Sequence, residues 1–273
     1  MTEQMVIAMF LLLRKMNNKI KISIITVTFN SEKTIRDTIE SVHSQDYDNI
    51  EHVIIDGDST DNTIEIVKSY GDKISYFISE KDDGIYDAMN KGIRAATGDV
   101  IGILNSDDFY PCFHVISDVV KVFEDDDPDS VYGDLIYVDK DNTNKILRYW
   151  ESKPFKRGKI RRGWMLPHPT FFIKKEIYNK FGLYSIRLKS AADYEMMVRL
   201  LFKNTISVKY IPRVLVNMRN GGISNDSIRN RWRANHEDYV SWKINGIDPP
   251  FLLRFIKPFS KIIQFFRRPK NNG

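Results

Sequence analysis

Short apolar runs alternate with segments of helical periodicity through the first half of the chain, and this alternation constrains the fold most. The runs are rich in Val and Ile, which is typical of strands buried on both faces. They are residues 20–27, 51–56, 74–79 and 99–104. After the first run, Ser31 is placed as a helix N-cap, and Ile35, Ile39 and Val42 fall on one helical face. Alternating strands and helices predict a mostly parallel sheet with helices on both faces.

Composition and absent motifs exclude several classes of protein. The 273 residues are 42% hydrophobic, which is enough for a packed core and argues against disorder. A single cysteine, Cys112, excludes a disulfide framework and a cysteine-based zinc site. The chain has no G-x-G-x-x-G after its first strand, no P-loop and no G-x-S-x-G. Dinucleotide-binding, P-loop and serine-hydrolase domains are therefore not expected.

Acidic residues follow three of the four predicted strands, where a parallel sheet places its functional loops. They are Asp56, Asp58 and Asp61, then Glu80, Asp82 and Asp83, then Asp107 and Asp108 after Asn105. Neighbouring carboxylates repel each other unless a cation or hydrogen-bond donors balance them. Oxygen-rich clusters suit Mg²⁺ or Mn²⁺, so we expect a divalent ion bridging carboxylate and diphosphate. The alternative is that each aspartate only caps the next turn or helix.

Four segments, in order and at matching spacing, resemble family 2 glycosyltransferases, which have the GT-A fold. They read ISIITVTFNSEKTIRDTIESVHSQDY, EHVIIDGDSTDNT, SEKDDGIYDAMNKGIRAATGDVIGILNSDDFY and SAADYEMMVRL, and the resemblance spans residues 19–225, most of the chain. The resemblance implies a Rossmann-like, mostly parallel sheet, a nucleotide-diphospho-sugar donor, a divalent cation (Mg²⁺ or Mn²⁺) and transfer with inversion. Because Q-x-x-R-W is not met and no transmembrane bundle is present, a non-processive enzyme of bacterial surface-polysaccharide type is expected.

The resemblance also implies which residues bind the donor. The loop after the first strand lies beside the nucleotide, and an aspartate ending the second strand contacts the base or ribose. A third loop passes over the nucleobase, and the start of the D-x-D triplet contacts the ribose. By position these residues are Thr28, Phe29, Asn30, Asp56, Asp82, Asp83, Asn105 and Ser106.

The resemblance further implies a metal ligand and a general base, with departures from the family pattern. Asn105-Ser106-Asp107 occupies the D-x-D triplet, so Asp107 is the metal-binding position, while the Asn105 amide brings no charge. Asp193 matches the general base of the family's E-D pair, but Ala192 replaces its acidic neighbour. Met89 replaces an arginine expected near the diphosphate, and Lys91 or a later basic residue is a candidate substitute.

The reaction read from these residues is a single displacement. An acceptor hydroxyl needs one carboxylate base, and the departing diphosphate needs a metal. Alternatives remain open at the residue level: Asp193 is also placed to cap a helix, and Glu195 is a second candidate base. His168 and Asp108 are candidate contacts to acceptor or phosphate, and a structural loop histidine is an equal reading of His168. Gly221–Ser224 reads as a phosphate-binding turn or an ordinary loop.

The two ends predict extensions around the GT-A domain of residues 19–225. Residues 1–18 form an N-terminal extension whose apolar run, Met5–Leu13, is too short for a membrane span. The alternatives are a non-native extension upstream of a start at Met16, a disordered arm, a short membrane-contacting anchor and a signal. Residues 226–273 are expected to form a helical, basic-amphipathic tail. Residues 251–273 alone hold six of the 41 basic residues and no acid, which favours an anionic membrane surface. Packing of that stretch on the domain is the alternative.

The expected function is therefore transfer of a sugar to an acceptor hydroxyl, with a lipid-linked glycan in polysaccharide assembly as acceptor. We expect a cytoplasmic enzyme, peripheral at the inner face of the cell membrane. Residues 152–163, which contain six basic residues and no acid, read as a solvated loop or as a surface for acceptor phosphate. Nucleic acid is not expected as a partner, because the basic excess lies in the tail. A sugar nucleotidyltransferase and a catalytically inactive nucleotide-sugar-binding module are the rival functions.

Overall fold

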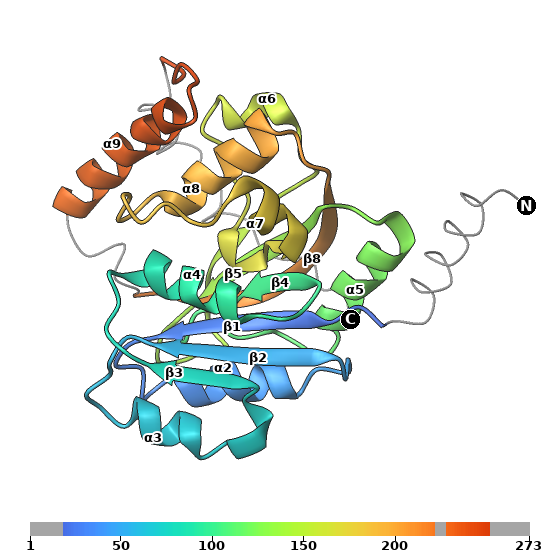
Figure 1. Ribbon diagram of the computed structural model, residues 1–273, viewed down its shortest axis with the longest axis vertical. Helices are drawn as coiled ribbons and strands as arrows, with labels where there is room; N and C mark the ends of the chain where they lie inside the picture. The colour runs from blue at the N-terminus through green and yellow to red at the C-terminus, as the bar shows by residue number, and fades with distance from the viewer. Residues whose placement is uncertain (1–18, 222–227, 252–273) are drawn as a thin grey trace, which may run out of the picture.

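Eight strands form one mixed sheet in the computed structural model, which describes residues 19–221 and 228–251 (Figure 1). The order is β3-β2-β1-β4-β7-β5-β6, with β8 beside β5. β1 to β4 run parallel, whereas β7 is antiparallel to β4. The bounds are β1 (Ile22–Thr28), β2 (Ile50–Asp56), β3 (Tyr76–Ser79), β4 (Val100–Ile103), β5 (Ser130–Val138), β6 (Ile146–Trp150), β7 (Phe172–Lys174) and β8 (Val208–Arg219).

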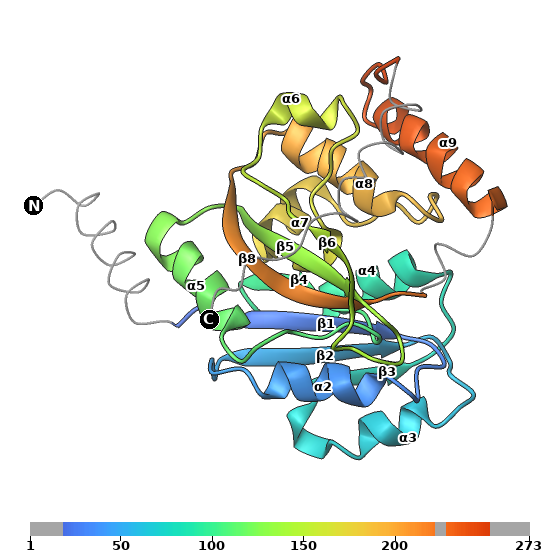
Figure 2. The ribbon, with the colours of Figure 1, turned by 180° about the vertical axis from the view of Figure 1, so that it is seen from behind.

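Helices cover both faces of this sheet, as the sequence predicts (Figures 1 and 2). The apolar residues of β1 alternate between the faces: Ile25 packs in one core with α4 and α8, and Ile24 packs in another with α5. Burying each such side chain contributes about 1.5–3 kcal/mol. The helices are α2 (Ile35–His43), α3 (Thr63–Lys68), α4 (Ile85–Ala95), α5 (Val115–Asp126), α6 (Arg157–Ile160), α7 (Lys175–Phe181), α8 (Ala192–Met197) and α9 (Ile228–Ile244), with short turns η1 (Gly71–Lys73), η2 (His168–Thr170) and a π-helical η3 (Val198–Lys203).

The predicted N-cap is wrong in one respect. α2 begins only at Ile35, after Thr34, and no side chain caps it. Residues 32–34 instead form a turn in which the Ser31 carbonyl accepts the N–H groups of Thr34 and Ile35, each at 3.0 Å. The Ser31 hydroxyl is therefore free to face the loop after β4, 2.8 Å from the Ser106 hydroxyl.

Helix α9, at the start of the predicted tail, packs on the domain. Trp242 is fully buried, and its indole N–H donates to the Tyr194 hydroxyl of α8 (3.1 Å). The basic, Phe-rich residues after Phe251 lie outside the described residues, as do the predicted extension 1–18 and residues 222–224 of the Gly-Gly turn. Across residues 19–221 and 228–251, the helices are too short or too polar to cross a membrane.

Candidate active site

The carboxyl ends of β1 to β4 meet along one edge of the sheet. Thr28 pairs with Asp56 and Asp56 with Ser79, so the first three strands end side by side. After β4, the Ser106 N–H donates to the Val27 carbonyl (3.3 Å), which brings the next loop beside β1. The four loops therefore adjoin one another, at the place where open α/β sheets bind their ligands.

At this edge, the exposed ring of Phe29 and the carboxylate of Asp82 lie on either side of Gly57, which has no side chain. Phe29 is 56% exposed, directly after β1. A Cβ at Gly57 would lie 2.6 Å from Asp82 Oδ2 and 3.5 Å from the Phe29 ring, so all three positions are in contact range. Asp82 Oδ1 accepts the Gly84 N–H (2.8 Å), and Asp83 is exposed beside it. This arrangement offers a planar ring a stacking surface with an acceptor at its edge.

Hydrogen bonds, buried at Asp56 and exposed at Asn30, hold the loops after β1 and β2. The Asp56 carboxylate is fully buried and accepts from the Ser59 N–H (2.9 Å) and the Ser79 hydroxyl (2.6 Å). Asn30, at φ 48°, accepts the Thr60 N–H (2.8 Å) through its side-chain oxygen. These two residues thus position the loop that carries Phe29. Direct contact of either side chain with a nucleotide stays a prediction.

The turn after β4 contains the Asn-Ser-Asp triplet and one further aspartate. The Asp108 N–H donates to the Asn105 carbonyl (3.0 Å), which closes the turn. Asp107 is partly buried and Asp108 fully buried. Burial raises the pKa of Asp107, and the Arg219 charge opposes this. Burial, followed by the charge of Asp107, raises the pKa of Asp108 well above its usual range. A cation at this turn would stabilise both carboxylates.

Arg219 lies beside this turn, and the sequence analysis did not single it out. Its guanidinium is 7% exposed, donates to the Asp107 carbonyl (2.9 Å) and pairs with Asp37 of α2. It also stacks over the Phe109 ring, 4.9 Å from the centroid. Arg219 therefore fixes the turn and offsets part of its negative charge, while Asp37 partly neutralises Arg219.

Buried polar atoms that lack a partner gather at the same turn. In the described part of the chain they are Thr28 Oγ1, Asn105 Oδ1, Asp108 Oδ1 and Asn217 Oδ1. Asn217 of β8 belongs here because its backbone pairs with Phe109 (2.9 and 3.0 Å). Buried polar atoms are normally hydrogen-bonded, and each unpaired one costs about 1–3 kcal/mol. The unpaired atoms therefore mark a place where a ligand or ion would be stabilised.

These oxygens fit a divalent cation that is completed by phosphate. Within the described ranges, no group of three His, Cys, Asp or Glu side chains forms a ready-made metal site. Mg²⁺ is commonly held by one or two carboxylates together with substrate phosphate oxygens. Asp107 and Asp108 supply carboxylates, and Asn105 supplies an amide oxygen. The donor set therefore fits Mg²⁺ or Mn²⁺, provided that a diphosphate supplies the remaining oxygens.

A cavity of about 180 Å³ opens between this turn and the amino end of α8. Asn105 lines it from the turn, and Asp193, the second residue of α8, lines it from the helix. The remaining lining residues are Ile85, Tyr86, Met89, Leu135, Tyr137, Trp150, Met165, His168, Pro169, Lys189, Ser190 and Met218. The structure thus brings Asn105, His168 and Asp193 to one cavity, whereas Phe29, Asp56, Asp82 and Asp107 do not line it.

One carboxylate oxygen of Asp193 is not used to cap helix α8. Its Oδ1 accepts the Tyr194 N–H (2.8 Å) and the Tyr86 hydroxyl (3.3 Å). Oδ2 makes no hydrogen bond with any described residue. The N-cap of α8 is Ala191, without a side-chain cap, so the capping alternative explains only part of this geometry. Asp193 thus keeps one oxygen available to take a proton.

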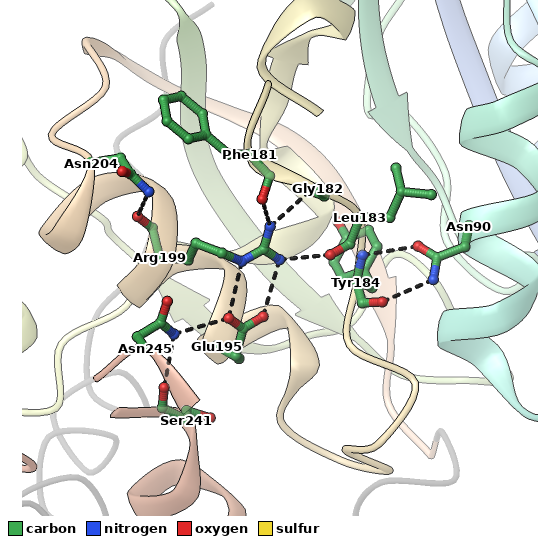
Figure 3. Close-up of polar contacts among 10 residues, drawn as sticks. All are labelled: Asn90, Phe181, Gly182, Leu183, Tyr184, Glu195, Arg199, Asn204, Ser241 and Asn245. Carbon is green, nitrogen blue, oxygen red and sulfur yellow. Dashed lines mark hydrogen bonds and ion pairs between the residues drawn. The ribbon is translucent and has the colours of Figure 1, made fainter. Parts of the chain in front are cut away.

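Aromatic side chains around Asp193 hold His168 in place. The His168 Nε2 lies 2.5 Å from the Tyr184 hydroxyl, and Tyr184 stacks on Tyr86 at 5.8 Å. Burial lowers the pKa of His168, and the Asp193 charge opposes this. The Asn90 amide fixes Tyr184 through two backbone hydrogen bonds of 2.9 Å (Figure 3). His168 is therefore a neutral ring at the cavity wall, in contact with Tyr184 instead of standing alone in a loop.

Glu195, the other candidate base, instead belongs to a hydrogen-bond network that stabilises the fold. It is 2% exposed and binds Arg199 in bidentate fashion (3.0 and 3.1 Å). Arg199 also donates to the carbonyls of residues 181–183 after α7, and Asn245 of α9 donates to Glu195 (2.9 Å), as Figure 3 shows. This network joins α7, α8 and α9 and leaves Glu195 no free oxygen at the cavity.

Comparison with known proteins agrees with this geometry. The family model described as Glycosyl transferase family 2 matches residues 23–181. An uncharacterized glycosyltransferase of Mycobacterium tuberculosis is 32% identical over 180 residues, which is 65% of this chain and 68% of the relative. A PGL/p-HBAD biosynthesis glycosyltransferase of Mycobacterium bovis is 27% identical over 208 residues, covering 74% and 78% respectively.

Solved structures share the fold at lower identity. S. aureus TarS 1–349 in complex with UDP-GlcNAc has a TM-score of 0.66 at 20% identity, over 82% of this chain and 65% of that one. The match to longer TarS covers only 39% of that chain. Mannosyltransferase PcManGT from Pyrobaculum calidifontis, in complex with GDP-Man and Mn²⁺, has a TM-score of 0.62 at 15% identity, over 93% and 79%.

The α/β sheet is thus a GT-A fold, and the family match rules out the nucleotidyltransferase reading. The chain belongs to glycosyl transferase family 2, as a glycosyltransferase that takes its sugar from a nucleotide sugar.

Proposed function

We propose that this enzyme transfers the sugar by a single, inverting displacement in the cavity between Asp193 and the turn of residues 105–108. The cavity itself carries this proposal. Asn105, in the turn with Asp107 and Asp108, lines one side of it, and Asp193 lines the other, with Tyr137 also in its wall. Two separated acidic groups, the turn of residues 105–108 for the leaving group and Asp193 for the acceptor, suit a displacement with a single base.

The nucleotide is proposed to bind on the loops outside the cavity. At about 180 Å³ the cavity is smaller than pockets that enclose a whole drug-sized ligand, so it suits the transferred sugar alone. Phe29 provides a stacking face for the base, with Asp82 and Asp83 at its edge. We assign Asn105 and Ser106 to the ribose. Asn30 and Asp56 hold the loop that carries Phe29, and Thr28 ends the strand before it. UDP-GlcNAc and GDP-Man are the donors named with the structural neighbours, which leaves the base and sugar open.

The proposed metal ligand is Asp107, with Asp108 and Asn105 as nearby oxygens. The unpaired Asp108 and Asn105 oxygens support this assignment, as does the Mn²⁺ named with PcManGT. When bound, Mg²⁺ or Mn²⁺ would neutralise charge on the diphosphate as it leaves. Arg219 holds the backbone of Asp107 so that its carboxylate keeps one orientation.

Asp193 is the proposed general base. The acceptor oxygen forms a bond to the anomeric carbon while the bond from that carbon to the diphosphate oxygen breaks. The hydroxyl proton passes to Asp193 Oδ2, while Tyr86 and the Tyr194 N–H hold Oδ1. A positioned base contributes about 10²–10⁴ in rate. His168, neutral and bound to Tyr184, is placed to orient the acceptor hydroxyl.

The proposed acceptor is a lipid-linked glycan, reached from an anionic membrane surface on the cytoplasmic side. Lys156, Arg157, Arg161 and Arg162, around α6, are exposed and form no ion pair with a described residue. Arg157 and Arg161 instead stack on the Phe202 ring, at 4.6 and 5.7 Å. α6 and the carboxyl end of α9, which leads to the basic residues 252–273, lie at the same end of the molecule (Figures 1 and 2).

A donor panel tests the proposal directly. Purified full-length enzyme with Mn²⁺ would be incubated with uridine- and guanosine-diphospho-sugars, and nucleoside diphosphate release would be measured with and without a lipid-linked acceptor. We expect release with one donor, and its loss in Asp193→Asn. Binding of donors without any release or transfer, across acceptors, would favour an inactive binding module and contradict the proposal.

The membrane surface has its own test. A protein truncated after Pro250 would be compared with the full chain for sedimentation with vesicles containing anionic lipid, at low and high salt. We expect the full chain to bind and salt to weaken binding, because basic residues contribute about 1 kcal/mol each near such a surface. Retained binding in the truncated protein, lost on Arg161→Gln with Arg162→Gln, would assign the surface to α6. Binding that neither change affects would contradict a basic membrane surface.

A further inference from the structure

Lys189 connects the catalytic end of the cavity with the loops on the nucleotide side. It lies in the loop between α7 and α8, shortly before Asp193, and its side chain lines the same cavity. Its ammonium group donates to the backbone carbonyl of Asp83 (2.9 Å), in the loop after β3. The lysine therefore spans the space between the proposed base and the proposed nucleotide-binding loops.

Two other cations near this edge already pair with acidic residues. Lys91, the substitute that the sequence offered, pairs with Glu80 (2.8 Å) and Asp87 (3.7 Å). Arg219 pairs with Asp37. Among the described residues that line the cavity, Lys189 is the one Lys or Arg, and its ammonium makes no ion pair with any described residue.

We infer that Lys189 binds the diphosphate of the nucleotide-sugar donor and stabilises it as it leaves. This inference rests on the proposed function. A diphosphate placed beside Asp107 and Asp108 meets two acidic groups, so it needs a cation from another element besides the metal. Lysine is a compact charge on a flexible stem, which lets it turn from one acceptor to another. A charged phosphate oxygen is a stronger acceptor than the neutral carbonyl of Asp83, so the ammonium would move to the donor.

The location of Lys189 also suits the direction of the displacement. The leaving group departs from the face of the sugar opposite the acceptor and therefore opposite Asp193. Through Asp83, the ammonium is held on the side of the β3 loop, where Asp82 and Phe29 also lie. A charge in that place favours the separated diphosphate more than the intact donor, because the negative charge grows during departure.

The test separates charge from hydrogen bonding and from loop position. Lys189→Gln keeps a donor for the Asp83 carbonyl but removes the charge, whereas Lys189→Arg keeps the charge. Lys121→Gln, an exposed lysine on α5, is the matched control. With Mn²⁺, calorimetry would measure binding of UDP, UMP, GDP and GMP to each full-length protein. We expect Lys189→Gln to weaken binding of the preferred diphosphate about 10- to 100-fold, the range for a hydrogen bond to a charged group.

The expected selectivity makes the outcome decisive. Binding of the matching monophosphate should change less than threefold in Lys189→Gln, and Lys189→Arg should keep most of the diphosphate affinity. Unchanged diphosphate affinity in Lys189→Gln would overturn the inference. Equal losses for mono- and diphosphate would also overturn it, because they would assign Lys189 to holding the loop. If wild-type protein binds no nucleoside diphosphate, with any of the common bases, the proposed function itself fails.

Discussion

Asp108→Asn should stabilise the free protein while weakening its response to metal and nucleotide. The Asp108 side chain is fully buried, its Oδ1 has no partner, and Asp107 is its neighbour. An amide at this position would remove a buried carboxyl group from an acidic turn. It would also bring an N–H donor into the turn that holds the unpaired side-chain oxygen of Asn105. The wild-type residue is thus unfavourable for stability in the free protein.

The magnitude follows from the hydrogen bonds that become possible. One new buried hydrogen bond contributes about 0.5–1.5 kcal/mol, and leaving an oxygen unpaired costs about 1–3 kcal/mol. We therefore expect the free energy of unfolding to rise by about 1–2 kcal/mol, or Tm by roughly 2–8 °C for a chain of this size.

The pH dependence has a definite sign. The pKa of Asp108 is raised in the folded state above its ordinary 3.8, so the unfolded chain loses this proton first. Wild-type stability is then lost as pH rises from about 4, and the advantage of Asp108→Asn should grow over the same interval.

Thermal unfolding of full-length wild type, Asp108→Asn and the exposed control Asp125→Asn would be followed from pH 4 to pH 8. Each would be measured alone and with Mn²⁺ plus UDP or GDP. We expect nucleotide and metal to raise Tm of wild type more than that of Asp108→Asn, since the carboxylate is available to the ion only in wild type. A free Asp108→Asn protein that melts below wild type would refute the argument that this carboxyl group is unfavourably buried.

Three further outcomes are expected. Asp107→Asn should reduce turnover by about 10²-fold or more with the fold intact, and near-normal activity of that variant after EDTA treatment would contradict a metal role. Asp193→Asn should reduce transfer by about 10²–10⁴ while donor affinity changes only a few fold; joint loss of affinity, measured by calorimetry, would make Asp193 a structural or donor-binding residue. Burial, then the His43 charge, lowers the pKa of His52 to about 3, so its share of stability is present above pH 6.5 and lost below it. Urea unfolding at pH 5 should therefore show a loss of about 2 kcal/mol relative to pH 7, and His52→Gln should reduce that loss.

Local patterns predicted the sheet and the acidic edge well. A continuous apolar run such as residues 20–27 predicts a strand buried on both faces. Neighbouring parallel strands end at the same edge of a sheet, whatever segments connect them. The Asn105–Asp108 turn follows β4 directly, so its place required no long-range knowledge. The start of α2 was missed because the turn of residues 32–34, which delays the helix, depends on contacts between loops.

Contacts between distant parts of the chain could not be read from the pattern. Arg219 reaches the carbonyl of Asp107 across 112 positions, and Asn90 binds the backbone of Tyr184 across 94. Neither pair has a local sequence signature. The sequence also could not decide between Asp193 and Glu195 as the general base. Only the bidentate pairing of Glu195 with Arg199, seen in the structure, excludes Glu195. The sequence gives a weak indication that Tyr86 belongs to the site, because Tyr86 follows the D-D-G-I segment at the start of a helix.

Two buried carboxylates at opposite ends of the parallel strands, Glu51 and Asp108, have contrasting environments. At the amino end, Glu51 accepts hydrogen bonds from Ser23, Lys21 (2.9 Å) and both the hydroxyl and N–H of Thr97. Although burial alone would raise the pKa of Glu51, these donors lower it to about 2. At the carboxyl end, where Asp56 is fully hydrogen-bonded, Asp108 accepts from the Asn105 amide at 3.3 Å and from the Arg219 backbone, but its Oδ1 has no partner and its pKa is raised. The same sheet can therefore satisfy a buried acid fully when the acid serves the fold. The unsatisfied acid at the other end indicates that its partner arrives with the substrate, which is the physical reason to expect metal and diphosphate there.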